Sequence, residues 1–297
     1  MHWQELIDSP GVILADGAMG TMLFEAGLQF GEPPERWNVD HPERVQAVHQ
    51  AYLQAGSRIL LTNTFGGNRW RLSLHKLEGR ARELVEAGAR NTRAAVEAAG
   101  GRALVAGDIG PSGSLLAPLG ELEEAEAVTG FAEQAEALLA GGADVIWIET
   151  MSDLGEVAAA VRGVRQASSD VPILTTMTFD THGRTMMGVT PEKAVQTLSQ
   201  QGAAAVGGNC GNGPEEILGV LEKMRAASPQ TILIAKANAG LPTLVNGRAV
   251  YAATPESMGE YARAAAERGA RIVGACCGST PAHLQAMATA LAGRLAG

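Results

Sequence analysis

The sequence predicts a single (β/α)8 barrel, also called a TIM barrel, and three observations support that prediction. Eight short apolar runs alternate with helix-like segments over 297 residues, a usual length for such a barrel. The runs are continuously apolar, as expected for parallel strands that are buried on both faces. No linker rich in proline, glycine or serine divides the chain, so residues 1–297 are expected to form one domain. A doubly wound open sheet is the alternative fold.

The first four strand–helix units are expected before residue 168. Their strands are the apolar runs at 12–15, 59–61, 103–106 and 145–148. The first run ends in a glycine-rich turn, and residues 31–41 are expected to form a loop. A helix should then begin at Pro42, because proline suits the first helical position. Helical spacing of apolar residues predicts three further helices, at about 75–99, 123–140 and 154–167.

The last four units follow more closely on one another. Their strands are expected at 172–178, 203–206, 232–236 and 271–273. Four proline positions predict where the intervening helices begin, because threonine caps a helix and proline fits its first turn. These positions are Thr190-Pro191, Pro214, Thr254-Pro255 and Pro281.

Polar, glycine-rich clusters follow the predicted strands. In a barrel the carboxyl ends of the strands meet at one face, where the active site is built. Short loops are rich in glycine, asparagine and aspartate for conformational reasons alone, but those reasons do not explain why all three cysteines lie there too. The clusters are Asp16-Gly17, Asn63-Thr64, Gly107-Asp108, Glu149-Thr150, Asp180, Asn209-Cys210, Asn238 and Cys276-Cys277.

The three cysteines predict a metal site. Cys210 follows the sixth strand, and Cys276 and Cys277 follow the eighth, so their sulfurs could converge at one point. Three thiolates at one point form a soft-metal site, most plausibly for Zn²⁺, with one coordination position open. Adjacent cysteines on a strand point to opposite faces, so the backbone must turn there, and Gly274 and Gly278 allow that turn.

Two other interpretations of the cysteines remain open. Free cysteines are often simply buried in the core. A closed structural metal site would need a fourth protein ligand, and His283 should already lie in the next helix. An open zinc–thiolate site suits alkylation of a thiol, because Zn²⁺ lowers the pKa of a bound thiol and anionic sulfur ligands keep that sulfur electron-rich. Hydrolytic zinc sites more usually have nitrogen and carboxylate ligands.

The composition argues against several classes of protein. The formal net charge is −9 and there is no basic cluster, which argues against binding to nucleic acid or anionic membranes. The amino terminus does not resemble a signal peptide, and no run reaches the ~20 apolar residues of a membrane span. An odd number of cysteines indicates reduced thiols, so a cytoplasmic protein is expected.

Several motifs resemble those of the homocysteine S-methyltransferases. This family includes the homocysteine domain of cobalamin-dependent methionine synthase, betaine–homocysteine methyltransferase and the S-methylmethionine-dependent enzymes. The most specific motif is the cysteine pair followed by Gly-Ser-Thr-Pro, with an Asn-Cys pair upstream. The resemblance extends over nearly the whole chain and rests on residues 16–21, 62–65, 110–113, 149–150, 208–210, 238–242 and 276–281.

The resemblance implies a TIM barrel in which Cys210, Cys276 and Cys277 bind Zn²⁺. It also implies that the sulfur of homocysteine is the fourth ligand. Methyl transfer to this sulfur would give methionine. The same resemblance implies a substrate-binding region at the amino-acid end of homocysteine.

This second region would include Asp16, Gly17 and Glu149. Glu149 could pair with the substrate ammonium, while N–H groups of the glycine-rich turn could hold the carboxylate. The alternatives are that Glu149 caps the next helix and that Asp16 is only a turn residue. Asn238 is expected to occupy the open metal position in the free enzyme or to orient the substrate.

The methyl donor is left open between betaine, S-methylmethionine and a methyl-corrinoid supplied from methyltetrahydrofolate. Betaine would favour an aromatic cage, whereas the chain is only 4% aromatic. Thr150 follows Glu149, whereas the motif that the betaine enzymes resemble at this place is Glu-Tyr. Trp37, Phe65 and Trp70 could still contribute. A methyl-corrinoid would have to be brought by a separate protein.

Other functions and assemblies are also considered. The same site could methylate another thiol or a selenol. Alternatively, the chain could be a non-catalytic zinc-binding subunit that docks a corrinoid protein, which an exposed apolar rim at the carboxyl face of the barrel would favour. The oligomeric state is open, a homo-oligomer included.

Overall fold

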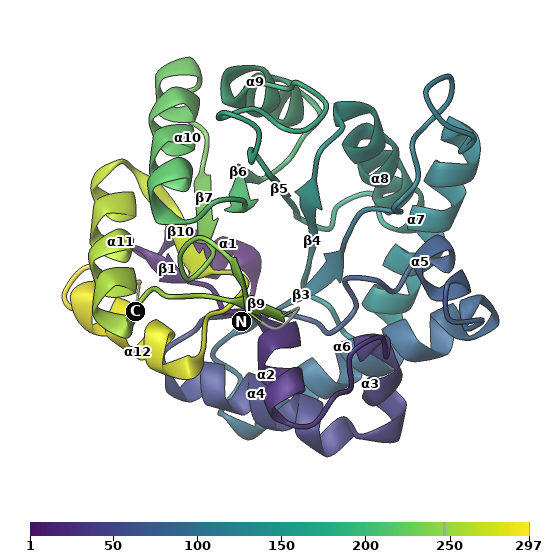
Figure 1. Cartoon of the computed structure of the whole chain (residues 1–297), viewed down its shortest axis with the longest axis horizontal. Coiled ribbons are helices and arrows are strands. Elements are labelled where there is room, and N and C mark those ends of the chain that lie inside the picture. The colour runs from purple at the N-terminus through teal and green to yellow at the C-terminus, as the bar shows by residue number, and fades with distance from the viewer. Residues whose placement is uncertain (246–247, 297) are drawn as a thin grey trace.

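Eight parallel strands form a ring that is surrounded by helices (Figure 1). The computed structural model describes residues 1–245 and 248–296. The strands follow the order β1-β10-β7-β6-β5-β4-β3-β2, and a parallel bridge between Ala15 and Ile59 joins the two ends of this order. The prediction of a (β/α)8 barrel is therefore confirmed, and the open-sheet alternative is wrong.

The strands of the ring lie where the continuous apolar runs predict them. Their side chains are almost all buried, because one face lines the barrel interior and the other packs against helices. The strands are β1 (Ile13–Leu14), β2 (Ile59–Leu61), β3 (Leu104–Ile109), β4 (Val145–Met151), β5 (Ile173–Met177), β6 (Ala205–Cys210), β7 (Leu233–Ala237) and β10 (Ala270–Ala275).

All the main helices except α6 begin at or within one residue of the predicted positions. Five of them have proline in the first turn, and the side chains of Thr190 and Thr254 accept backbone N–H groups at the starts of two. These caps explain why the helices start where they do. The main helices are α4 (Pro42–Gln54), α6 (Ala81–Ala98), α7 (Glu124–Ala140), α8 (Leu154–Ala167), α9 (Pro191–Gln200), α10 (Pro214–Ala227), α11 (Pro255–Glu267) and α12 (Pro281–Ala290).

Several short elements differ from the prediction. The predicted loop at 31–41 contains two helical segments, and the predicted helix at 75–99 begins only at residue 81. Short segments have weak periodicity, and tertiary contacts rather than local preference decide their conformation. Asn38, for example, donates hydrogen bonds to the carbonyl oxygens of Asn63 and Leu84. The additional elements are α1 (Trp3–Asp8), α2 (Met19–Glu25), η1 (Pro34–Arg36), α3 (Trp37–Asp40), α5 (Arg69–Ser73), η2 (Glu78–Arg80), β8 (Thr243–Val245) and β9 (Arg248–Val250).

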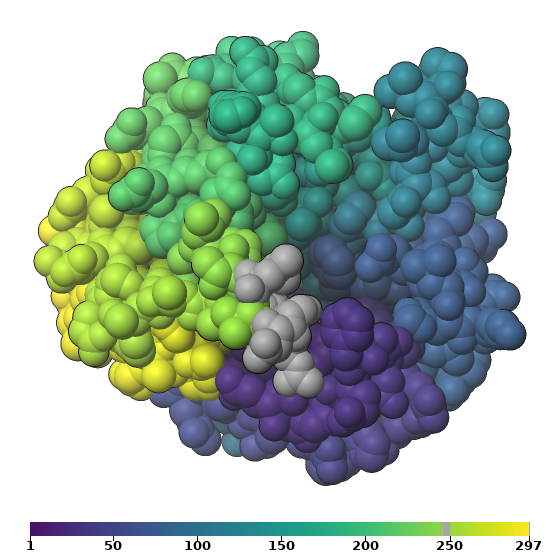
Figure 2. Space-filling view, viewed as in Figure 1, coloured from purple at the N-terminus to yellow at the C-terminus, as the bar shows by residue number. Residues whose placement is uncertain are grey.

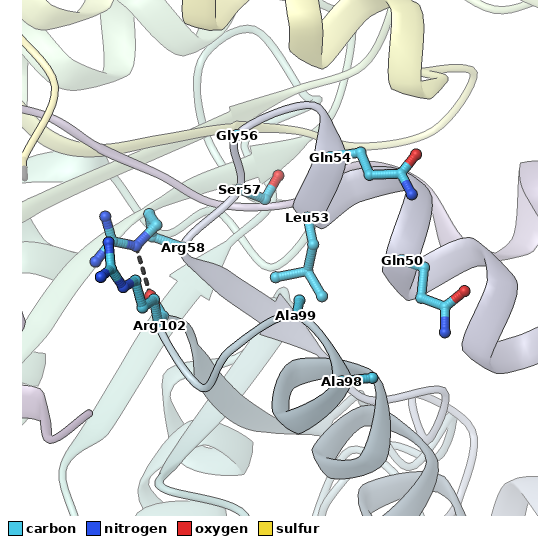
Figure 3. Close-up of a pocket in the computed structure, with 9 residues that line it drawn as sticks. All are labelled: Gln50, Leu53, Gln54, Gly56, Ser57, Arg58, Ala98, Ala99 and Arg102. Carbon is cyan, nitrogen blue, oxygen red and sulfur yellow. Dashed lines mark hydrogen bonds between the residues drawn. The ribbon is translucent and has the colours of Figure 1, made fainter.

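The amino end of the barrel is closed by α1. Leu6 is fully buried against the interior side chains, and Trp3 packs beside it. A pocket near this end lies between the last turns of α4 and α6, where the Nε of Arg58 donates to the carbonyl oxygen of Arg102 at 2.6 Å (Figure 3). This end is remote from the carboxyl ends of the strands, so the pocket is not the predicted active site. Within the described residues, no helix is long and apolar enough to span a bilayer.

Candidate metal and substrate site

The three cysteine sulfurs converge at the carboxyl end of the barrel. The Sγ atoms of Cys210, Cys276 and Cys277 all lie within 4.8 Å of one another. Sulfurs that share one tetrahedral zinc ion at ~2.3 Å lie roughly 3.8 Å apart, so little movement would be needed to bind one. The predicted convergence is confirmed, and the residues fit a metal ion that prefers thiolate ligands.

The backbone turns at the cysteine pair as the sequence requires. The last strand, β10, ends at Ala275, so Cys276 and Cys277 lie in the turn beyond it. Gly278 has φ +78°, a conformation that suits glycine. Gly274 has a different role from the predicted one, because it stays within the strand. A Cβ atom there would lie only 3.0 Å from the Cβ of Ala15.

The thiols share charge among themselves. Hydrogen bonds from Cys276 and Cys277 lower the pKa of Cys210. The same contacts raise the pKa of the other two cysteines. These contacts favour the thiolate form at Cys210 over the other two cysteines, and a metal ion would displace the remaining thiol protons.

Two asparagines position the turns around the sulfurs. The Oδ1 of Asn209 accepts the N–H of Thr150 at 3.0 Å, and its Nδ2 donates to the Thr150 hydroxyl at 2.7 Å. This pair ties the end of β4 to the end of β6. Asn238 donates from Nδ2 to the carbonyl oxygen of Gly211 at 2.7 Å, and its Oδ1 is buried without a partner. Asn238 therefore lies against the Cys210 turn, with one acceptor unused.

Asp16 is fully engaged below the cysteine turn. Its Oδ2 accepts the N–H of Leu61 at 2.8 Å, and its Oδ1 accepts the Nζ of Lys236 at 2.9 Å. Both charged side chains are 3% exposed. Burial raises the pKa of Asp16, and the charge of Lys236 opposes that shift. Asp16 therefore holds a buried ion pair in addition to its place in the turn after β1, and its contact with substrate stays a prediction.

Glu149 is a buried carboxyl with an unused oxygen. It is 8% exposed, and its Oε2 has no hydrogen-bond partner. Burial raises the pKa of Glu149 to about 8, and the charges of Cys276 and Asp16 raise it further, while Lys236 opposes the shift. Asp153 caps α8 through its Oδ1 instead, so the capping alternative for Glu149 is wrong.

Gly17 connects the turn after β1 to the cysteine turn. A Cβ atom on Gly17 would lie 2.6 Å from the Oγ of Ser279. That hydroxyl accepts the N–H of Ala18 at 3.0 Å and donates to the carbonyl oxygen of Cys276 at 2.8 Å. His283 lies in α12, as predicted, and its Nε2 lies 3.0 Å from the carbonyl oxygen of Ala253. This nitrogen is therefore not free to be a fourth metal ligand.

Sequence reasoning did not identify Lys236 or Tyr251, and it gave Asp108 only as part of a polar cluster at a strand end. Lys236 lies in an otherwise apolar strand, and a buried lysine needs a charged or polar partner. A lysine in such a run could therefore have indicated a buried ion pair. Asp108 is buried with its Oδ1 unpaired, and burial together with Glu149 raises its pKa. Tyr251, after β9, packs directly on Gly278, where a Cβ atom would lie 2.1 Å from its Cγ. Tyr251 thereby brings the β8–β9 hairpin to the cysteine turn.

The fold and the site together define a (β/α)8 barrel with a cluster of three cysteines, able to hold a metal ion, at the carboxyl ends of its strands. Comparison with known families identifies which barrel this is. The model of the family described as homocysteine S-methyltransferase matches residues 13–291, and the chain belongs to this family.

Known proteins similar to the chain include two methionine synthases. The chain is 34% identical over 306 residues to methionine synthase of Mycobacterium tuberculosis (strain ATCC 25618 / H37Rv), and the match covers 97% of this chain but 25% of that protein. It is 33% identical to methionine synthase of Mycobacterium leprae (strain TN), with 95% and 24% covered. The chain therefore spans about a quarter of the length of these relatives.

Solved structures of a shorter protein match over nearly their whole length. The metallated form of the homocysteine methyltransferase MmuM from Escherichia coli superposes with a TM-score of 0.78 at 25% identity, covering 96% of this chain and 98% of that one. The oxidised form of the same protein gives a TM-score of 0.79 at 24% identity, with the same coverage, and supports the fold.

Proposed function

We propose that the chain is a zinc-dependent methyltransferase that transfers a methyl group to the thiolate of homocysteine and forms methionine. The convergence of three cysteine sulfurs at the barrel mouth, in a member of this family, is the observation on which the proposal rests. The name of the similar E. coli protein supports homocysteine as the acceptor.

Different residues of the chain would bind the metal ion and the amino-acid end of the substrate. Cys210, Cys276 and Cys277 would hold the zinc ion. When bound, zinc lowers the pKa of a thiol that it ligates, so that a thiolate forms near neutral pH. Glu149 would accept the substrate ammonium on its unused Oε2 and lose its own proton as it does so.

Transfer of the methyl group forms one carbon–sulfur bond and breaks one bond between the methyl carbon and the donor. The homocysteine sulfur supplies an electron pair to the methyl carbon as the carbon–donor bond breaks, and the donor keeps that bond's electrons. The thiol proton is released to solvent. The protein has to orient the sulfur and methyl group and keep competing nucleophiles away, which are positioning roles.

Two of the three aromatic side chains considered for betaine, Trp37 and Trp70, do not favour it as the methyl donor, while Phe65 is half-buried after β2. Trp37 is 5% exposed and stacks with Arg44, whose guanidinium lies 5.0 Å from its ring centre. Trp70 packs edge-on against Phe131, with 5.6 Å between their ring centres. These rings hold helices together, so they are not available to form a cage around a quaternary ammonium.

An apolar rim supports a donor that is carried by a protein. The exposed large apolar side chains among the described residues lie in segments that follow strand carboxyl ends. The face of the molecule in Figure 2 is hollowed beside the segment that contains β8 and β9. Apolar side chains that are exposed at one end of a molecule can contribute to a contact region. We therefore propose that a separate corrinoid protein brings the methyl group. The rim comprises Phe24, Phe30, Val39, Leu74, Leu115, Leu119, Met186, Leu241, Val245 and Val250.

Methionine formation from a panel of donors tests the proposal. Zinc-loaded protein should convert homocysteine to methionine with at least one of betaine, S-methylmethionine, methylcobalamin or methyltetrahydrofolate, the last two with and without a corrinoid protein. Cys277→Ser should lose both zinc and activity, because one of three ligands is gone. Full activity in this variant, or protein without zinc after reducing purification, would contradict the proposal. Other thiols and a selenol in the same assay test the alternative acceptors.

Two broader features belong to the same proposal. Three reduced cysteines suit a reducing compartment, so we place the protein in the cytoplasm. Residues 1–297 are proposed to fold as one domain, because no strand of the ring can be removed without opening it.

A further inference from the structure

A buried lysine crosses the barrel beneath the cysteine cluster. Lys236 lies on β7, between Asn209 on β6 and Gly274 on β10 in the register of the sheet. Its Nζ is 2.9 Å from the Oδ1 of Asp16 and 5.1 Å from the ring centre of Trp147. We call Lys236, Asp16 and Trp147 the barrel floor.

The neighbouring strand makes room for this lysine. A Cβ atom on Gly274 would lie 3.1 Å from the Cγ of Lys236, so a larger residue would crowd the side chain. Cys276 follows Gly274 by two residues, which is roughly 7 Å along an extended chain. The ammonium of Lys236 is thus held about one layer of side chains below the sulfur cluster.

Stability alone does not explain the ion pair on the floor. Replacing a buried ion pair by apolar residues is often neutral or stabilising, because desolvation of both charges offsets their attraction. The lysine ammonium has three N–H donors, and Asp16 accepts only one of them. The Oε2 of Glu149, a residue whose charge interacts with that of Lys236, is a buried acceptor without a partner. The site therefore offers one cationic donor and one carboxyl acceptor that protein contacts leave unused.

We propose that Lys236 is a substrate-binding residue that donates to the α-carboxylate of homocysteine, while Glu149 accepts from its α-ammonium. This inference rests on the proposed function and assigns specificity within it. Three carbon atoms separate the sulfur from the carboxylate of homocysteine, a length suited to the step from the cysteine layer to the floor. The Lys236–Asp16 pair would then recognise the zwitterionic end of an amino-acid thiol and reject simple thiols.

Calorimetric binding to the zinc-loaded protein tests this assignment without measuring catalysis. Three ligands are compared: homocysteine, aminopropanethiol, which lacks the carboxylate, and mercaptobutanoate, which lacks the ammonium. The wild-type protein should bind each truncated thiol roughly 10- to 100-fold more weakly, as expected for loss of a charged hydrogen bond. Lys236→Met should bind homocysteine and aminopropanethiol equally and still disfavour mercaptobutanoate. Glu149→Gln, the matched control, should show the opposite pattern.

The binding results separate the role of Lys236 from the ability of the protein to bind homocysteine. If Lys236→Met keeps the wild-type preference for the carboxylate, or weakens all three ligands equally, Lys236 is a structural counter-ion and the inference is wrong. If the wild-type protein binds homocysteine without preferring its carboxylate, only the inference fails. If it binds no homocysteine at all, both fail. Should Lys236→Met unfold because Asp16 is left unpaired, the Lys236→Met/Asp16→Asn pair removes both charges and must show the same loss of carboxylate preference.

Discussion

Glu149 is neutral over much of the physiological pH range in the substrate-free protein, although it is a carboxylic acid. Its pKa of about 8 results first from burial and then from the negative groups around it. A neutral carboxyl can stay beside anionic thiolates at a lower electrostatic cost than an ionised one. Arrival of a substrate ammonium would reverse this balance, so binding at pH 7 should release the Glu149 proton in addition to the thiol proton.

The same pKa predicts how stability depends on pH. Between its unfolded pKa of 4.5 and its folded pKa of about 8, Glu149 binds more protons in the folded chain than in the unfolded chain. Its contribution to the free energy of unfolding is therefore complete below pH 4.5 and is lost as pH rises through about 8. Glu149→Gln should remove a decline on the order of 5 kcal/mol across this range.

Urea unfolding of metal-free protein at several pH values between these limits measures the effect. Glu78→Gln, which changes an exposed carboxyl on η2, is the control and should leave the wild-type slope unchanged. An equal slope in the Glu149 variant and the wild type would show that the burial of Glu149 has no such consequence.

The cysteine turn depends on the contact between Gly278 and Tyr251. Gly278→Ala would place a Cβ atom 2.1 Å from the Tyr251 Cγ and would also strain a residue at φ +78°. The turn must shift and carry its two cysteines with it, so zinc affinity should fall by about 10-fold or more, comparable to loss of a supporting contact. Chelator competition measures this affinity.

Gly293→Ala separates strain from contact in that experiment. Gly293 has φ +79°, nearly the same conformation, but no atom lies within 4 Å of its would-be Cβ. This variant should lose about 1 kcal/mol of stability and bind zinc as the wild type does. Equal zinc affinities in the two variants would remove the role assigned to the Tyr251 contact.

Strand β6 packs so closely against β7 that one added methyl group on β6 should destabilise the fold. A Cβ atom on Gly207 would lie 1.9 Å from the carbonyl oxygen of Ile234, which is backbone and cannot rotate away. Gly207→Ala should lower the free energy of unfolding by about 3 kcal/mol or more. Gly219→Ala, in the middle of α10 with open space around it, should raise it by ~0.5–1 kcal/mol. Thermal and urea unfolding compare the two, and a Gly207 variant as stable as the wild type would contradict the packing argument.

Elements with strong local signals were predictable from the sequence, whereas those set by distant contacts were not. The strands of the ring are continuous apolar runs, and helix starts such as Thr190-Pro191 have a local capping reason. The cysteine cluster was also predictable, because strand ends in a barrel share one face. The Lys236–Asp16 pair joins residues 220 positions apart, so it depends on a register that no local pattern contains. The short α3 and the β8–β9 hairpin are likewise fixed by the surfaces against which they pack.

At the scale of the whole molecule, the apolar rim predicts selective loss of one kind of methyl donor. Phe30 and Leu119 are 86% and 70% exposed and follow β1 and β3. Phe30→Glu with Leu119→Glu should reduce methionine formation from a corrinoid protein by roughly 10-fold or more, because interface centres are intolerant of buried charge. Transfer from free methylcobalamin should not change.

Gln54→Glu provides the matched surface control for that experiment. It adds a charge at the opposite end of the barrel, beside the pocket of Figure 3, and should affect neither donor. If the rim variant slows free and protein-borne donors alike, the rim shapes the mouth itself and does not dock a partner.

The ligands of the cluster come from β6 and from the turn after β10, the strand that completes the ring between β7 and β1. During synthesis on the ribosome, the first cysteine emerges 66 residues before the next, so a growing chain can present only one sulfur of the three for most of that time. Under the proposed function, binding of the metal ion would therefore require β10 to have docked. The three sulfurs come together only after β10 has paired with β7 and β1. An incomplete chain would therefore lack the full set of ligands for the ion.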